Sequence, residues 1–500
     1  MRLKLTICVW MILGAGTAAA QDSLSEKLVR EQTSPVTVLR DELYTSPALK
    51  AWQRENTYSR LSASFGKHEQ DLYLQQEGSG KQQLDVHSET YLRGKDNTTI
   101  WGKAYYISEK LFKVKFNESA NYDLVYPYVM ADTVGGDLNS ETYAFSGGLA
   151  KGFGKYQVGV QAGFKGEQSY RNRDPRPKNI STILDLGVAV SRRLGNRYLL
   201  ALDLNGTKYN QENKLEFVSE VGEPLIYHDA GLGAYNEFLS GARMSANYNG
   251  FIYGAGLQLS PAGRKGWYAG VSVQQTNIGK LLDRIVFEIG TAKERLLSGR
   301  AGYIFDKDDR HFMAGVKATG LSREGLEAKF QTGASDISIV KIAEDVRYKR
   351  ACNTVGANVL YGRTGGFADW YAGADAEYLD ELQQYVQPNR RLSFTRLTAG
   401  IHLTGRKQFG RTSVTLKAAA HRQETLEQSG SWSDINPQKA IFSMMNSNFA
   451  FLTASGMNYR GQARVDFPLM EKLACFIAAD AAHQTGTGRQ EWKLTTAFQF

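Results

Sequence analysis

The sequence predicts an all-β protein, a transmembrane antiparallel β-barrel of about 18 strands. Three observations lead to this fold class: apolar and polar residues alternate along most of the chain, a secretory signal begins it, and an aromatic residue ends it. Alternate residues of a strand lie on opposite faces, and outer-membrane barrels turn an apolar face to lipid and a polar face to the lumen. Strand counts from one sequence are imprecise, and about 14 to 18 strands fit the pattern.

The C-terminal segment, residues 490–500, has the pattern of a strand that closes a barrel. Its apolar residues share one parity and its polar residues the other: Trp492, Leu494, Phe498 and Phe500 against Lys493, Thr495 and Gln499. We expect barrel-assembly machinery to read Trp492, Phe498 and Phe500 as an assembly signal. We also expect this strand to pair with the first strand, near Tyr58, because a ring without free edges is needed in lipid.

The N-terminus reads as a signal peptide over residues 1–20. A basic start is followed by an apolar run and by small residues suited to cleavage: Met1 to Lys4, Thr6 to Gly16, and Thr17 to Ala20. The apolar run is too short to span a bilayer as a helix. We therefore expect export, and localisation in the bacterial cell outer membrane.

Residues 21–57 do not alternate and form a separate N-terminal segment ahead of the barrel, which we expect to occupy residues 58–500. Four apolar residues could line a short helix within this segment: Leu39, Leu43, Leu49 and Trp52. The segment either folds into the lumen as a plug or stays in the periplasm as a disordered tail.

Composition fits a barrel better than a helical membrane protein. The chain has 50 Gly, 26 Tyr and 23 Phe but only 10 Pro, and its mean hydropathy of −0.39 reflects strands with one polar face. Its net charge of +9 becomes +7 once Arg2 and Lys4 leave with the signal. An exported chain meets lipopolysaccharide phosphate first, so we expect outer-membrane lipid and lipopolysaccharide as partners and no nucleic acid.

Alternating segments come in pairs joined by short turns, and longer polar stretches separate the pairs. The short turns lie at 94–97, 153–155, 194–196, 262–264, 306–310, 364–366, 405–410 and 468–472. The longer stretches lie near 108–142, 168–180, 210–242, 278–294, 321–344, 380–392 and 423–456. Barrels of the outer membrane have short periplasmic turns and long outer loops. A soluble sandwich or propeller is disfavoured, because the apolar parity keeps aromatic ends and no blade repeat is present.

The segment Asp41 to Lys50 (DELYTSPALK) precedes the first strand, Tyr58 to Gly66. It resembles the Asn-Pro-Ala-Leu lead-in of uncharacterised outer-membrane β-barrel proteins of Bacteroidota, with Ser46 in place of the usual Asn. The Ala20-Gln21-Asp22 segment around the predicted cleavage site and the final Gln499-Phe500 are similar too. The resemblance implies a porin-like barrel over almost the whole chain, and it implies no catalytic or binding residues.

The sequence offers no constellation for catalysis, so we expect no enzyme. His402, His421 and His483 are expected to point inward, but their spacing fits no metal site and favours polar lining of the lumen. Ser413 and His421 lie on one strand about 26 Å apart, too far for a nucleophile and its base. Cys352 and Cys475 form no disulfide or metal motif. We expect neither a metal nor a cofactor.

Charged residues of inward parity are the better functional lead. They are Lys155, Lys165, Asp185, Asp203, Asp375, Glu377, Lys417, Arg460, Arg464, Asp466 and Lys493. Unpartnered charges in a dry interior cost several kcal/mol each, so the lumen is either hydrated or laced with ion pairs. A ring of about 18 strands is also too wide for side chains alone to fill. The sequence therefore favours a pore or uptake channel for small polar solutes.

One predicted outer loop is strongly basic, with Arg171, Arg173, Arg176 and Lys178. It either binds phosphate or acidic glycans or, as we favour, is simply solvated. The long stretches 210–242 and 423–456 support an alternative function, a non-conducting surface scaffold in adhesion or envelope assembly. An outer-membrane enzyme ranks last. The pattern identifies no particular solute or protein partner.

Overall fold

The computed structural model describes residues 24–218, 224–239, 241, 245–283, 285, 287–307, 309–332, 339–470 and 473–500. The predicted signal peptide, residues 1–20, lies outside them. Within the described ranges, no helix is long and apolar enough to cross a membrane.

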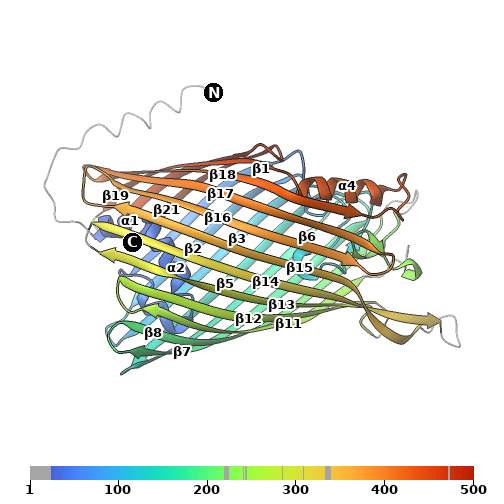
Figure 1. Ribbon diagram of the computed structural model, residues 1–500, viewed down its shortest axis with the longest axis horizontal. Helices are drawn as coiled ribbons and strands as arrows, with labels where there is room; N and C mark the ends of the chain where they lie inside the picture. The colour runs from blue at the N-terminus through green and yellow to red at the C-terminus, as the bar shows by residue number, and fades with distance from the viewer. Residues whose placement is uncertain are drawn as a thin grey trace.

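Eighteen strands form one closed antiparallel ring, which confirms the predicted fold class (Figure 1). Each strand pairs with its neighbours along the chain. The strands are β1 (Tyr58–Glu69), β2 (Gly80–Arg93), β3 (Thr98–Val114), β5 (Gly136–Phe153), β6 (Tyr156–Tyr170), β7 (Arg176–Leu194), β8 (Tyr198–Glu216), β11 (Ala246–Pro261), β12 (Lys265–Leu282), β13 (Gly290–Lys307), β14 (Arg310–Thr332), β15 (Ile339–Arg363), β16 (Asp369–Tyr385), β17 (Arg390–Phe409), β18 (Thr412–Ser431), β19 (Gly456–Met470), β20 (Leu473–Gln484) and β21 (Arg489–Gln499).

The ring closes where β21 pairs with β1, as the terminal strand pattern predicts. Phe498 lies opposite Leu61 in this pairing. The backbone of Phe500 exchanges two hydrogen bonds with that of Ser59, at 2.7 and 2.9 Å. The last residue of the chain is thus part of the seam, and the ring has no free edge.

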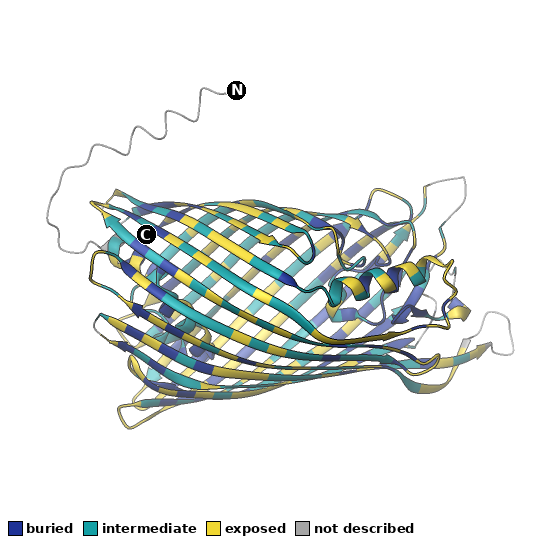
Figure 2. Cartoon of the chain, turned by 45° about the horizontal axis from the view of Figure 1, so that its top comes forward, coloured by how far each residue is buried: buried dark blue, intermediate teal, exposed yellow. Residues whose placement is uncertain are grey.

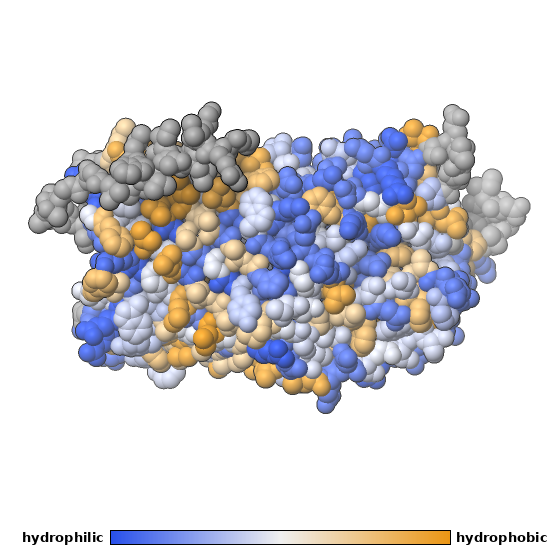
Figure 3. All heavy atoms as spheres, turned by 90° about the horizontal axis from the view of Figure 1, so that it is seen from above, coloured by the Kyte–Doolittle hydropathy of each residue, from blue (hydrophilic) through white to orange (hydrophobic). Residues whose placement is uncertain are grey.

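Residues alternate between the two faces of the wall along every strand (Figure 2). Large apolar side chains on the outer face are strongly exposed, and Leu186, Trp267 and Val271 keep 57%, 63% and 62% of their surface. Figure 3 shows one side of this outer surface, where hydrophobic residues are interspersed with polar ones. Such exposure of apolar groups indicates a surface that contacts lipid or another protein.

The two ends of the barrel differ. Turns of a few residues join strand pairs at one end, which also holds the C-terminus and is called the short-turn end below. The opposite, long-loop end carries the extended connections 115–135, 217–245 and 432–455. This asymmetry follows the predicted distribution of turns and loops.

The N-terminal segment lies inside the ring at the short-turn end and is called the plug. It comprises α1 (Leu24–Thr33), α2 (Pro35–Leu43) and the 3-10 helix η2 (Pro47–Trp52). Pro35 and Pro47 begin the last two helices, because proline suits the first turn of a helix. Leu43 and Leu49 are buried in a core shared with inward residues of the wall such as Tyr268.

The long connections also fold back into the ring. They contain α3 (Tyr122–Val125), η3 (Glu237–Leu239), α4 (Ala440–Leu452), and a small sheet of β4 (Met130–Ala131), β9 (Tyr227–Gly231) and β10 (Ala234–Tyr235). Side chains of the barrel wall hold this backbone: Tyr248 Oη donates to the Tyr128 carbonyl at 2.9 Å, and Lys280 Nζ to the Val129 carbonyl at 2.9 Å. The backbone at Tyr128 and Val129 therefore lies in the mouth of the barrel, whereas the hairpin of β14 and β15 projects beyond it (Figure 1).

Candidate functional site in the barrel lumen

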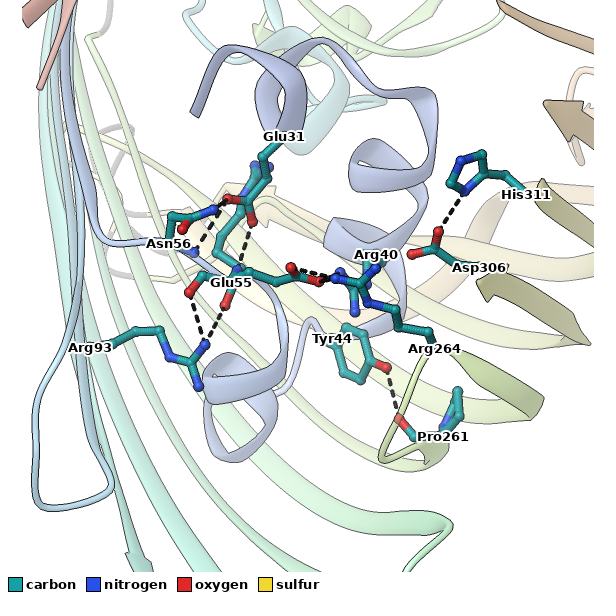
Figure 4. Close-up of polar contacts among 11 residues, drawn as sticks. Glu31, Arg40, Tyr44, Glu55, Asn56, Arg93, Pro261, Arg264, Asp306 and His311 are labelled. Atoms are coloured by element: carbon teal, nitrogen blue, oxygen red, sulfur yellow. Dashed lines mark hydrogen bonds and ion pairs between the residues drawn. The ribbon is translucent and has the colours of Figure 1, made fainter. Parts of the chain in front are cut away.

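Hydrogen bonds join the plug to the wall in both directions (Figure 4). Backbone carbonyls of the plug accept from the wall, and a plug hydroxyl donates to a wall carbonyl. Tyr44 Oη donates to the Pro261 carbonyl at 2.8 Å, while Ser260 Oγ donates to the Leu43 carbonyl at 3.2 Å. Burial raises the pKa of Tyr44 to about 12, so this hydroxyl remains a donor at neutral pH. The contact fixes the end of α2 to the turn that follows β11.

Glu55, just after the plug helices, links the plug to the barrel rim. Its carboxylate accepts from Arg40 at 3.0 Å and from Arg264 at 2.6 Å, and Arg93 donates to its carbonyl at 3.0 Å (Figure 4). Glu55 and Arg264 are 42% and 51% exposed, and exposed ion pairs contribute only about 0–1 kcal/mol. The apolar core around Leu43 and Leu49 is therefore the main attachment of the plug.

A glycine of the wall lets the plug backbone approach closely. Gly159 on β6 faces η2, and a Cβ there would lie within 2.6 Å of the Pro47 carbonyl oxygen. Any other residue would force this backbone away. By contrast, a Cβ at Gly163 on the same strand would meet its nearest neighbour at an ordinary 3.4 Å.

Most of the predicted lumen residues do line the inner wall, and several have partners. Lys165 contacts Glu167 at 2.8 Å, Lys317 contacts Glu377 at 2.7 Å, and Asp185 accepts from Thr207 at 2.5 Å. Asp375 lies 3.1 Å from His421 and 3.6 Å from His402. Most of these pairs join side chains of different strands across the inner wall.

Two inward assignments differ from the expectation. Lys155 lies in the turn between β5 and β6, because the strands end at Phe153 and Tyr156. His483 is opposite Tyr459, whose ring is 48% exposed on the outer face, so this histidine faces outward. The alternation of β6 does not extend back across the turn to Lys155. On β20, His483 shares the parity of the outward-facing Ile477.

The remaining predicted cations converge on one part of the wall. Four neighbouring strands, β18 to β21, form a recess of about 370 Å³ that opens to the lumen. Lys417, Arg460, Arg464 and Lys493 line it. Asp203, on the other hand, lines a second recess of about 390 Å³ across the ring, together with Arg300 and Lys317.

One of the four recess cations is held differently from the other three. Arg464 contacts Asp466 at 2.5 Å and lies over the ring of Phe476, 3.6 Å from its centroid. Lys417, Arg460 and Lys493 lie within 4.0 Å of no carboxylate oxygen among the described residues. Sequence reasoning missed Gln462 and Glu491 as lining residues, although they share the inward parity of Arg460 and Lys493.

The basic loop is a structural element more than an exposed cluster. Arg171 is 2% exposed and contacts two fully buried carboxylates, Glu118 at 2.6 Å and Asp132 at 2.9 Å. Arg171 is therefore not available to an external ligand, contrary to the phosphate-binding interpretation. Arg176 pairs with Asp174 at 2.8 Å, and only Arg173 and Lys178 are exposed, with Lys178 on the outer face of β7.

A buried acid lies in the loop sheet of the long-loop end. Burial raises the pKa of Asp229 to about 7, although the backbone N–H groups of Ala230 and Gly231 donate to its carboxylate at 3.0 and 3.3 Å. Among the described residues, no three histidine, cysteine, aspartate or glutamate side chains are grouped so that they could hold a metal ion.

The ring, its internal plug and its charged lumen define a large closed antiparallel β-barrel. The chain belongs to a family of unknown function (DUF6850), whose model matches residues 47–500. No curated protein sequence matches the chain significantly.

Several solved outer-membrane receptors are similar in structure. They are the siderophore receptor PiuA from Acinetobacter baumannii (8% identity, 89% of this chain and 82% of that chain, TM-score 0.40), the ferric preacinetobactin receptor BauA from Acinetobacter baumannii (10%, 89% and 80%, 0.39), and the ferric-catecholate import receptor Fiu from E. coli K12 (9%, 89% and 82%, 0.38).

Proposed function

We propose that this protein is an outer-membrane uptake channel for small polar solutes. The observation that carries the proposal is the unfilled, charge-lined lumen wall between the plug and the inward loops, with recesses of about 370 and 390 Å³. A purely structural barrel would fill such space with apolar or fully paired side chains, because unpaired buried charges are costly.

Water or a polar solute must therefore occupy the middle of the lumen. Among the described residues, Lys417, Arg460 and Lys493 have no carboxylate oxygen within 4.0 Å, and solvation by water or a polar solute offsets the cost of placing these charges in the wall. No residue of the plug or of the long loops is among those that line the recess on β18 to β21. In this proposal the plug and the inward loops close the two ends, and the solute occupies the space between them.

Transport then requires that the end closures move. The plug at the short-turn end is held by two small apolar cores, by hydrogen bonds such as that of Tyr44 Oη to the Pro261 carbonyl, and by exposed ion pairs, and it joins the barrel at Tyr58. Such a segment can swing aside as a unit. In this proposal the short-turn end faces the periplasm and the long-loop end faces outward, as in outer-membrane barrels generally.

The proposal includes a setting and partners. The outer face contacts outer-membrane lipid and lipopolysaccharide, and barrel-assembly machinery reads Trp492, Phe498 and Phe500 on β21. The proposal also relates this chain to outer-membrane barrel proteins of Bacteroidota, which its Ser46–Leu49 lead-in resembles. No catalytic step belongs to it.

Planar-bilayer recording of the purified protein tests the channel. The full chain should show conductance, and a variant without residues 24–52 should conduct several-fold more because the plug is gone. Heat-modifiable migration on gels checks that both chains are folded. If the shortened chain does not fold, Gly159→Ala in the full chain provides the same comparison. Silence of every folded form would overturn the proposal.

A second function, a sealed surface scaffold, is favoured by the packing at the long-loop end. Two apolar cores fill that mouth, one around Tyr348 and Met444 and one around Tyr209 and Ile226. A scaffold predicts no conductance with or without the plug, and it predicts capture of a partner that loop deletion abolishes. The same recordings thus separate the two functions.

A further inference from the structure

We propose that the recess on β18 to β21 is a binding site for small solutes that carry two or more negative charges as carboxylate or phosphate groups. This inference rests on the proposed function and assigns the substrate class to the lumen. The site is the recess lined by Lys417, Arg460, Arg464 and Lys493.

Strand register brings two lysines to the same level of the wall. Lys417 pairs with Gln462, Gln462 pairs with Asp480, and Asp480 pairs with Lys493. Neighbouring strands lie about 4.8 Å apart, so the two lysine Cα atoms are about 14 Å apart. Their long side chains can approach a solute between them from both sides.

Arginines on β19 lie on either side of this row. Arg460 and Arg464 are two residues before and after Gln462, and both face the lumen. A guanidinium group donates in a planar fork that fits carboxylate and phosphate oxygens. Arg464 is fixed by Asp466 and Phe476, whereas Arg460 has no carboxylate oxygen within 4.0 Å among the described residues and can turn to a ligand.

Small side chains create the space. Ala478 and Ala482 line the recess on β20 at the levels of Arg464 and Arg460. Larger residues there would fill the volume and cover the arginines. A recess of about 370 Å³ lies within the range of small-molecule sites.

The charge balance of the recess is positive. Glu491 forms an ion pair with Arg489 at 2.6 Å, and Asp466 forms one with Arg464. Asp480 accepts a hydrogen bond from Gln462 at 2.7 Å. Among the described residues, Lys417, Arg460 and Lys493 have no carboxylate oxygen within 4.0 Å, so with Glu491 shared between Arg489 and the more distant Arg460, cations outnumber carboxylates in the recess. An anion with at least two charges neutralises this excess, which a neutral sugar cannot do.

The second recess across the ring does not have this character. Its Lys317 is paired with Glu377, and its Arg300 donates to the Glu42 carbonyl of the plug. Asp203 adds a negative charge there. Anion binding is thus expected on the β18 to β21 wall and not on the opposite one.

Isothermal titration calorimetry of the full-length barrel in detergent tests the site, with citrate, inorganic phosphate and sucrose at equal ionic strength. We expect at least one of the two anions to bind and sucrose not to bind. The triple variant Lys417→Gln/Arg460→Gln/Lys493→Gln should weaken anion binding at least tenfold. Citrate binding alone would assign a carboxylate solute, and phosphate binding alone a phosphate-bearing one.

The matched control removes three charges from the outer face. Lys151, Lys178 and Lys208 share the parity of the exposed Phe153, Ile180 and Leu204, and their triple change to Gln should leave anion binding unchanged. Equal weakening in both triple variants, or no anion binding by the folded wild type, would overturn the site.

Reversal potentials in a KCl gradient separate this inference from the channel itself. A conducting wild type should prefer chloride, and the lumen triple variant should lose that preference. Conductance without anion binding or anion preference would overturn the site and leave the channel intact. Anion binding by a barrel that never conducts would support the site and reject the channel.

Discussion

At the scale of single residues, Arg171 shows how a polar residue can be misread from sequence. Its neighbours in the chain are polar, so the loop looked solvated. The carboxylates that bury it, Glu118 and Asp132, are more than 35 residues away, and nothing local marks them. Inward parity, by contrast, is a local property, and in the structure Lys417, Arg460, Arg464 and Lys493, which share it, line one recess of the wall.

Replacing Arg171 tests whether it holds the loop at the mouth. Arg171→Met leaves two buried carboxylates without their cation, which costs about 3–5 kcal/mol. The segment 115–135 should detach and become sensitive to protease added to the folded barrel. Arg173→Met, at an exposed neighbouring position, should leave protection unchanged. Equal protection of both variants would show that the buried cluster does not hold the loop.

Asp229 should make the loop sheet sensitive to pH. Its folded pKa of about 7 exceeds the ordinary value of 3.8, so the folded loop binds more protons than the unfolded one between these values. Packing should be most stable below about pH 4, weaken as the pH rises to about 7, and change little above that. Hydrogen exchange of residues 227–235, corrected for intrinsic rates, measures this. Asp229→Asn should remove the trend; a trend of opposite sign would contradict the assignment.

At the scale of elements, strands could be predicted and the internal segments could not. Alternation with period two is written into each strand, so the ring, its turns and its closing pair followed from the sequence. The plug and the loop sheet depend on contacts between distant residues, such as Tyr44 with Pro261. One short helix was expected in residues 21–57, whereas the described part of that segment holds two α-helices and a 3-10 helix.

Gly159→Ala tests how closely the plug approaches the wall. The added Cβ would overlap the Pro47–Ala48 backbone, and crowding of this kind costs about 1–3 kcal/mol. We expect faster hydrogen exchange in residues 47–52 while the barrel keeps its heat-modifiable migration. Gly163→Ala, where the nearest contact is 3.4 Å, is the matched control. Unchanged exchange in the Gly159 variant would place the plug elsewhere.

The last three residues of the chain should matter for assembly and not for transport. Deleting residues 498–500 removes the outward Phe498 and the two Phe500 hydrogen bonds to Ser59. We expect several-fold less folded barrel in the membrane, measured by surface labelling and heat-modifiable migration. Phe367→Ala, an exposed aromatic outside the seam, should have no such effect. Near-normal levels of the truncated chain would refute the role of the seam.

At the scale of the whole molecule, the protein is a ring with a plug inside one end, loops packed into the other, and a polar space between them. The plug contacts the wall of β5 to β8 through η2, and the loops fill the opposite mouth. The number of strands could be predicted because each hairpin appears in the sequence as two alternating segments joined by a short turn. Whether the lumen was open or plugged could not, because that depends on how segments far apart in the sequence pack inside the ring.

The most direct test of the central claim, that solutes pass through this lumen, is flux into liposomes carrying the purified barrel. Entry of citrate, phosphate and sucrose is compared with protein-free liposomes, for the full chain and for Gly159→Ala. The account predicts entry above the protein-free level with the full chain, faster entry with Gly159→Ala, and preference for an anion over sucrose. Folded barrels that admit none of the three solutes in either form would contradict it.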